Sequence, residues 1–141
     1  MNQDNVAPKS GIFHPPRALS RKTAEPILYL ADKMAMADNE AVPREMRMID
    51  LIADAVGLPT FRHQPWFREM TEAAALQRLT TDLAKRATLV VLSLILKADA
   101  KRRPAEQAYF SRLREQLGAP PITVPVDLEA HKKLALQYFQ D

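Results

Sequence analysis

This chain carries the motif Ala37-Asp38-Asn39-Glu40-Ala41-Val42-Pro43-Arg44-Glu45 twice, the second time as Ala98-Asp99-Ala100-Lys101-Arg102-Arg103-Pro104-Ala105-Glu106. The two copies lie 61 residues apart, because Asp38 corresponds to Asp99. Asp, Pro and Glu occupy the same places in both copies. This repetition predicts two related helix–loop–helix units, at about residues 27–59 and 88–120.

The composition is that of an ordinary globular domain. The chain has 141 residues, of which 47% are hydrophobic and 26% charged, and this length suits one domain with a single core. The net charge of +3 argues only weakly for an anionic partner. Cysteine is absent, which excludes disulfides, thiolate metal sites and cysteine nucleophiles and suits the reducing cytoplasm. We therefore expect a cytoplasmic location.

Both units show the apolar periodicity of helices that bury one face. Helical patterning begins after Pro26 and should stop near Ala37, and a second helix should begin at Pro43, since proline suits a first helical turn. Gly57 and Gly118 are the expected caps at the helix ends. The apolar face of the second helix recurs in the second unit: Met48, Ile49, Ile52 and Val56 correspond to Tyr109, Phe110, Leu113 and Leu117.

The most apolar run, residues 89–96, is expected to form the central buried helix. It is shorter than the roughly 18–20 apolar residues that a bilayer requires, so we expect no transmembrane segment. Between the two units, Pro65 should open a short helix that uses Trp66 as a core anchor. Residues 72–85 should form one amphipathic helix, and Asp127 is the expected cap of a last helix.

No strand pattern of any length appears, so the sequence predicts an all-α fold. We expect a compact helical bundle of two pseudo-twofold-related helix–loop–helix units with connecting and C-terminal helices. Residues 1–25 contain three prolines among polar and basic residues and have no apolar segment of the kind found in secretory signals. They are expected to form a loosely ordered arm ahead of a single domain at residues 26–141.

Two interpretations of the repeated acidic residues remain open. In the first, Glu45 and Glu106 occupy the third helical position, where a carboxylate reaches back to the cap N–H and complements the helix dipole. Asp38 and Asp99 then end the preceding helices through side-chain turns. In the second, all four carboxylates converge on a hard divalent cation such as calcium, manganese or zinc. The first copy would then be the stronger half-site, because the second copy is basic.

The basic residues of the second copy suggest an alternative function. Lys101, Arg102 and Arg103 lie together in its loop and would favour an anionic ligand. No aromatic interleaving or groove-reading motif accompanies them, so nucleic acid is a less favoured partner than protein. A purely structural adaptor without any ligand is the third hypothesis.

No catalytic set of residues stands out. His14, His63 and His131 are far apart and lack the spacing of metal ligands, and Ser93 is expected to bond back to its own helix. The nucleophile elbow, the P-loop and the dinucleotide fingerprint are all missing from the sequence. We therefore expect that this protein is not an enzyme.

The repeated motif resembles that of the TerB-like (tellurite-resistance protein B) domains. These domains have an Ala-Asp-Gly loop, then a Glu seven positions after the Asp, on an amphipathic helix. Here Asp38 and Glu45, and again Asp99 and Glu106, keep this spacing, and the similarity covers roughly residues 26–121. The usual loop glycine is Asn39 in the first copy and Ala100 in the second.

The resemblance implies both a fold and a role. Members of this family form all-helical, pseudo-twofold bundles without catalytic activity and act in bacterial stress response through protein partners, often near the membrane. The family is also associated with a divalent-metal site, which by position would lie on Asp38, Glu45, Asp99 and Glu106.

Overall fold

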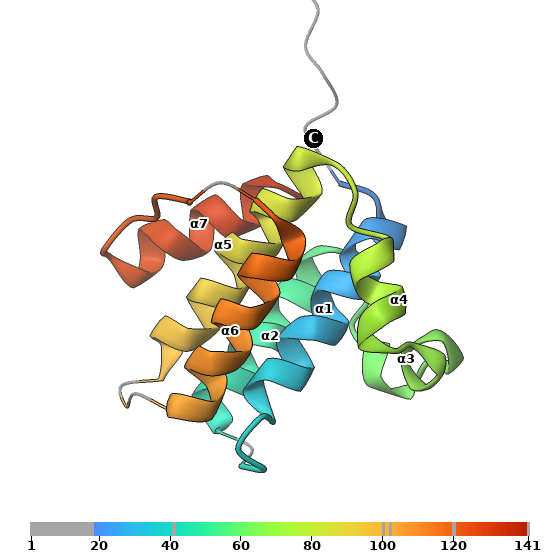
Figure 1. Ribbon diagram of the computed structural model, residues 1–141, viewed down its shortest axis with the longest axis horizontal. Coiled ribbons are helices and arrows are strands. Elements are labelled where there is room, and N and C mark those ends of the chain that lie inside the picture. Colours follow the sequence, from blue (N-terminus) through green and yellow to red (C-terminus); the bar gives the residue numbers. More distant parts are fainter. Residues whose placement is uncertain (1–18, 41, 100, 102, 120, 141) are drawn as a thin grey trace, which may run out of the picture.

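The computed structural model describes residues 19–40, 42–99, 101, 103–119 and 121–140. This part of the chain is an all-α bundle, as the sequence predicts, and contains no β-strand (Figure 1). Its helices are α1 (Arg21–Ala35), α2 (Pro43–Ala55), α3 (Pro65–Glu69), α4 (Glu72–Gln77), α5 (Asp82–Ala98), α6 (Pro104–Leu117) and α7 (Leu128–Gln137), and one turn of 3-10 helix, η1 (Phe61–His63), precedes α3.

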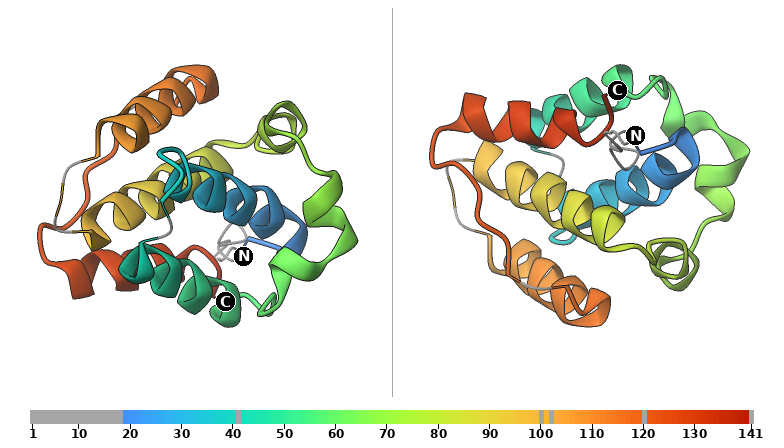
Figure 2. Two further views of the ribbon diagram at one scale, coloured as in Figure 1. Left: turned by 90° about the horizontal axis from the view of Figure 1, so that it is seen from below. Right: turned by 90° about the horizontal axis from the view of Figure 1, so that it is seen from above.

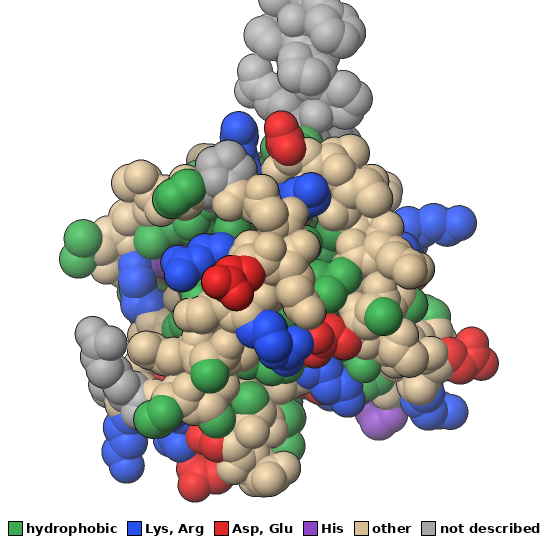
Figure 3. Space-filling view, viewed as in Figure 1, with side chains coloured by type: hydrophobic (Ala, Val, Ile, Leu, Met, Phe, Trp, Pro, Cys, Tyr) green, Lys and Arg blue, Asp and Glu red, His purple; other side chains and the backbone are tan. Residues whose placement is uncertain are grey.

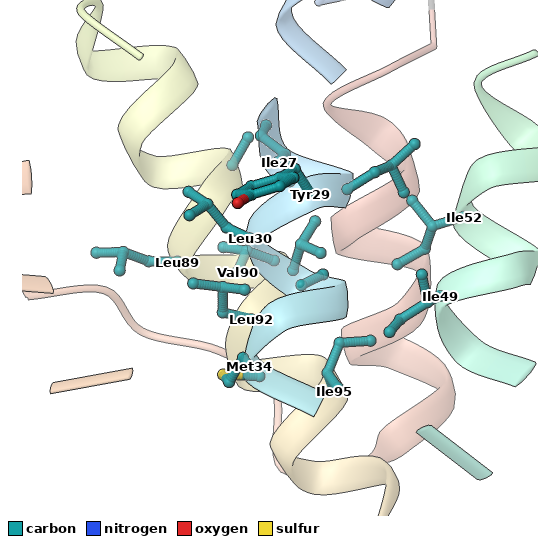
Figure 4. Packing of buried hydrophobic residues seen from close by; sticks show 14 of the residues in the cluster. Ile27, Tyr29, Leu30, Met34, Ile49, Ile52, Leu89, Val90, Leu92 and Ile95 are labelled. Carbon is teal, nitrogen blue, oxygen red and sulfur yellow. The ribbon is translucent and has the colours of Figure 1, made fainter. Parts of the chain in front are cut away.

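Helices α1 and α5 form the centre of the bundle. They pack against each other, α2 and α6 pack on both, and α7 packs on α5 (Figures 1 and 2). Figure 4 shows Leu92 and Ile95 of α5 in one apolar cluster with Met34 of α1 and Ile49 of α2, and all four side chains are fully buried. The run 89–96 is therefore the central buried helix that the sequence predicts.

The two repeated units are the helix pairs α1–α2 and α5–α6. In each unit the second helix begins at the motif proline, as predicted. The apolar face has the same residue spacing in both units, but the corresponding side chains are buried to different extents. Ile52 and its counterpart Leu113 are both fully buried, whereas Phe110 is only half-buried where the first unit buries Ile49 completely.

The caps at the helix ends follow the predicted residues. Gly57 and Gly118 have φ angles of +81° and +67°, in the left-handed region that glycine adopts without steric cost. Asp127 accepts a hydrogen bond from the backbone N–H of Ala130 at 2.9 Å and so starts α7.

The first helix begins earlier than predicted, at Arg21. Ser20 caps it by accepting a hydrogen bond from the backbone N–H of Thr23 at 3.3 Å. Leu19 is tied to the other end of the chain, since its N–H donates to the carbonyl of Tyr138 at 2.7 Å. Residues 19–25 thus belong to the domain, and the predicted boundary at residue 26 is wrong. The rest of the predicted arm, residues 1–18, lies outside the described residues.

Pro26 was expected to precede the first helix but lies inside it. A proline has no N–H, so the carbonyl of Lys22, one turn earlier, loses its helical hydrogen bond. Arg78 replaces that bond, because its Nη2 donates to the Lys22 carbonyl oxygen and also lies 3.1 Å from Oε1 of Glu25. A side chain that follows α4 therefore completes a helix more than 50 residues earlier in the chain.

Replacing Arg78 with Ala should lower the free energy of unfolding by about 0.5–1.5 kcal/mol, the usual net value of such a hydrogen bond. The loss should shrink in a Pro26→Ala background, because the alanine N–H restores the helical bond to Lys22. A double-mutant cycle measured by urea unfolding gives the coupling between the two residues. Strict additivity would show that Arg78 does not act on this carbonyl.

Residues 72–85, predicted as one helix, form two. Helix α4 ends at Gln77, and α5 begins at Asp82 after Thr81 caps it by accepting a hydrogen bond from the N–H of Ala84 at 3.1 Å. The apolar period continues across the break, which explains why the pattern alone suggested a single helix. A Thr side chain that bonds to the backbone competes with the helix and favours a new start.

The short helix that begins at Pro65 is confirmed as α3. Trp66, its second residue, is only half-buried. The fully buried aromatic residue of this region is Phe61 of η1. Its ring packs edge-on against Phe67 at a centroid distance of 5.4 Å. Phe61 therefore takes the anchoring place that the sequence suggested for Trp66.

None of the helices in the described ranges combines the length and the apolar composition that a bilayer-spanning helix needs. The result agrees with the expectation from the length of the apolar run in α5.

Candidate functional site

The repeated acidic motif assembles at one end of the bundle. The loop after α1 and the loop after α5 both lie at the lower end in Figure 1. Asp38 and Asp99 stand in these loops, while Glu45 and Glu106 lie in the first turns of α2 and α6. The two glutamates lie close to each other, and the charge of Asp99 raises the pKa of both, while that of Asp38 raises the pKa of Glu106. The structure thus brings together all four residues that the sequence singled out.

Each aspartate shapes its own loop. Asp38 Oδ1 accepts a hydrogen bond from the backbone N–H of Glu40 at 3.1 Å, and Asp99 Oδ1 accepts one from the N–H of Lys101 at 3.2 Å. These are the side-chain turns that the first interpretation predicts. In the first loop, Asn39 has a φ of +64°, a left-handed conformation that asparagine tolerates.

Arg103 places a cation between the two loops. Its Nη1 lies 3.2 Å from Oδ2 of Asp38 and 2.8 Å from Oε1 of Glu40, and its Nε donates to Oδ2 of Asp99. The hydrogen bond from Arg103, helped by the N–H of Lys101, lowers the pKa of the Asp99 carboxyl. One guanidinium therefore bridges carboxylates of both copies.

The two glutamates do not make the capping contacts that the first interpretation assigned to them. Glu45 and Glu106 are almost fully buried, at 0% and 1% exposure. Among the described residues, neither oxygen of Glu45 nor Oε2 of Glu106 receives a hydrogen bond from a donor group. Their carboxyl groups face each other instead, at a separation that allows a hydrogen bond when one of them is protonated.

This burial keeps a proton on the glutamate pair. The pKa of Glu45 is raised to about 8, mainly by loss of solvation and also by the neighbouring Glu106 and Asp99, while Arg103 opposes the shift. Burial also raises the pKa of Glu106. Since two carboxylates in contact cannot both ionise at low cost, burial and contact together favour a protonated carboxyl in the pair.

The four carboxylates do not form a coordination shell for a divalent cation. Within the described ranges, no group of three or more His, Cys, Asp and Glu side chains is placed to hold a metal ion. One carboxyl oxygen of Asp38 and one of Asp99 face Arg103, and the two glutamates face each other. The arrangement therefore does not fit the ion that the resemblance implies, and metal binding stays a prediction.

The residues of the basic loop in the second copy do not form one free cationic surface. Lys101 is exposed, Arg102 lies outside the described residues, and Arg103 is engaged with three carboxylates. The anion-binding alternative was based on all three side chains. With Arg103 committed to the chain's own aspartates, it depends on Lys101 and Arg102 and stays a hypothesis.

A Ser–His contact joins α5 to α7, and it was not foreseen. Ser93 Oγ lies 3.2 Å from Nε2 of His131 and 3.0 Å from the carbonyl of Val90, to which it donates. The same His131 nitrogen lies 3.0 Å from that carbonyl, so the hydrogen-bond network assigns the proton to Nε2. His131 also follows Leu128 at helical spacing, and this periodicity was the signal that it belongs to the buried face of α7.

This contact is built for packing. A protonated Nε2 cannot accept the serine proton, and a general base must be able to do so. Burial lowers the pKa of His131. In a catalytic triad, an aspartate accepts a hydrogen bond from Nδ1 of the histidine and orients its ring. Among the described residues, Nδ1 of His131 has no hydrogen-bond partner. Ser93 also bonds back to its own helix, as predicted.

Comparisons of this chain with protein-family models, with curated proteins and with solved structures found no match.

Proposed function

We propose that this chain is a non-enzymatic helical module of the TerB-like type that acts by binding protein partners. In this proposal its acidic motif is held together by the chain's own cation, Arg103, and not by a bound metal. The observation that carries the proposal is the bridge from Arg103 to Asp38 and Asp99, which joins the two copies of the motif.

The chemistry of the remaining polar groups supports a role without catalysis. The glutamate pair is buried away from solvent, so it does not present a carboxylate to a substrate. The serine and histidine that touch each other lack a free basic nitrogen at the point of contact. A module of this kind works through its surface, and we include the wider role that the resemblance implies, a bacterial stress response such as tellurite resistance.

The distribution of surface charge favours protein over nucleic acid as the partner. On the face shown in Figure 3, Lys and Arg side chains are interspersed with Asp and Glu side chains and do not gather into one patch. Nucleic-acid binding requires a continuous basic surface that neutralises several phosphates.

Removal of Arg103 tests whether it replaces a metal. The Arg103→Ala variant should melt several degrees below the wild type, since Asp38, Glu40 and Asp99 then repel one another without a counter-ion. Calcium or manganese should raise the melting temperature of the variant, because hard cations bind clustered carboxylates, and should leave the wild type unchanged. Thermal-shift assays measure the melting temperatures, and calorimetry with calcium, manganese and zinc measures metal binding.

The control for this experiment is Arg112→Ala, which removes an arginine bonded to Glu72 elsewhere on the surface. It should show no response to metal. Heat of binding in the wild type that disappears in a Glu45→Ala/Glu106→Ala variant would instead establish a metal site and refute the internal-cation part of the proposal.

Partner binding itself can be tested in the cells that produce this chain. A photo-activated amino acid placed singly at exposed positions, such as Leu51, Gln116 and Lys133, should form a discrete cross-link to a protein from at least one of them. Mass spectrometry would identify the linked segment. A chain that forms no cross-link from any face would contradict the proposed function.

A further inference from the structure

An open hollow of about 320 Å3 lies between α2 and α7, at the end of α5. Figure 2 shows α2 and α7 side by side, and each packs on α5 more closely than on the other. The space between them is therefore not closed by their own side chains. We call it the α2–α7 groove, and its lining residues are Arg44, Arg47, Met48, Leu51, Ala98, Leu128 and Lys132.

The floor of the groove is apolar. Met48 and Leu128 are half-buried, and Ala98 is almost fully buried. Leu51 stands at the edge with 38% of its surface exposed, which makes it one of the few large apolar side chains exposed in the described ranges. Apolar surface recessed between two helices is a site that a further apolar side chain can fill.

The rim of the groove is cationic. Arg44 and Arg47 are exposed, and neither forms an ion pair with any carboxylate of the described residues. Lys132 stands on the opposite side, and its one ion pair within the described residues is with Glu129, three positions before it, at 2.9 Å. Both walls therefore present positive charge to whatever enters between them.

We propose that the α2–α7 groove binds an acidic amphipathic helix of a partner protein. The partner's apolar residues, spaced three and four positions apart, lie on Met48, Leu51 and Leu128. Its flanking Asp and Glu residues meet Arg44 and Arg47 on one side and Lys132 on the other. This assignment rests on the proposed function and adds the place and the chemistry of the partner.

Charge and shape favour this occupant over two others. A second copy of this chain would bring a net charge of +3 to an already cationic rim. An anionic membrane would match the charge, but the apolar floor is recessed between helices and cannot reach into a flat bilayer. A helix matches both features, since it can lie lengthwise between α2 and α7 and offer apolar and acidic residues together.

The test uses a labelled probe peptide of about five helical turns, with leucines at three- and four-residue spacing framed by glutamates. Fluorescence anisotropy should show saturable binding to the wild type that weakens with added salt. The Arg44→Glu/Arg47→Glu variant should bind at least about tenfold more weakly. A second peptide has lysine in place of every glutamate. It should bind the Arg44→Glu/Arg47→Glu variant more tightly than the wild type, because the charges of both partners are then reversed.

Controls separate the groove from general charge effects. The Arg86→Glu/Arg114→Glu variant reverses two exposed arginines on α5 and α6, outside the groove, and should bind the acidic peptide as the wild type does. A Leu51→Glu variant, which places a charge on the apolar edge, should also lose binding. Circular dichroism and the melting temperature confirm that each variant is folded.

Equal binding of the acidic peptide to all variants, or no binding to any, would overturn the assignment. A second result would also overturn it: the wild type binds phosphatidylserine vesicles but not the peptide, and Arg44→Glu/Arg47→Glu abolishes the vesicle binding. The surface would then face a membrane. A cellular cross-link from Leu51 to an acidic amphipathic segment supports the groove. Cross-links only from other faces would refute the groove but leave the proposed function standing.

Discussion

Glu45→Gln should make this protein more stable at alkaline pH than the wild type, by roughly 1–3 kcal/mol near pH 9. The pKa of Glu45 is about 8 in the folded protein, compared with 4.5 for an ordinary glutamate. The folded state therefore keeps a proton that the unfolded chain releases. The stability linked to this proton is complete below about pH 4.5 and is lost as the pH rises through about 8.

Glutamine is uncharged and keeps the shape of the protonated carboxyl, so the variant escapes this loss. The coupling of Glu45 to Glu106 reduces the effect below the full value of the shift. Urea unfolding of both proteins at several pH values between 5 and 9 measures the difference. Near pH 5 the two should have nearly equal stability.

The matched control is Glu115→Gln, which changes an exposed glutamate on α6. Its stability curve should run parallel to that of the wild type over the whole pH range. Glu106→Gln should change the curve in the same direction as Glu45→Gln, because burial raises the pKa of both carboxyls. Parallel curves for all four proteins would show that the pair is ionised and solvated in the folded state.

Ile95→Ala should lower the free energy of unfolding by about 2–5 kcal/mol. Ile95 is fully buried in α5, in the cluster that joins this helix to α1 and α2. Truncation to alanine removes three heavy atoms from a packed site and leaves a cavity that the rigid central helices cannot close. Stability measured by urea unfolding gives the loss directly.

Two further substitutions give the scale of this effect. Ile95→Val removes one carbon and should cost about 0.5–1.5 kcal/mol. Leu51→Ala, on the exposed edge of the α2–α7 groove, should change stability by no more than about 0.5 kcal/mol. Similar losses for Ile95 and Leu51 would contradict the placement of α5 at the centre of the bundle.

Most of the fold was predictable because local chemistry and tertiary packing favour the same structure. The motif prolines start α2 and α6, glycines follow their ends, and residues 89–96 are too apolar to lie anywhere but the centre. The prediction of the first helix failed because its start depends on a residue far away in the sequence. Pro26 reads as a helix start, yet Arg78 bonds to the carbonyl that this proline leaves free, so the helix extends to Arg21.

The members of the acidic site were predictable, but their partners were not. Spacing identified Asp38, Glu45, Asp99 and Glu106, and the loop roles of the two aspartates followed from turn chemistry. Arg103 was assigned to a basic surface, because nothing in its own loop shows that it reaches Asp38, 65 residues earlier in the chain. The pairing of the glutamates likewise depends on how α2 and α6 approach, which one sequence does not specify.

The bridge at Arg103 makes the two halves of this chain unlike and mutually dependent. Counting back 61 positions, Arg103 corresponds to Val42, and Lys101 corresponds to Glu40. A dimer of two first halves would gather aspartates and glutamates with no arginine at the position of Arg103. A dimer of two second halves would contain two copies of the basic stretch 101–103, with four arginines and two lysines. Neither half can replace the other, so the bridge requires both copies of the motif in one polypeptide.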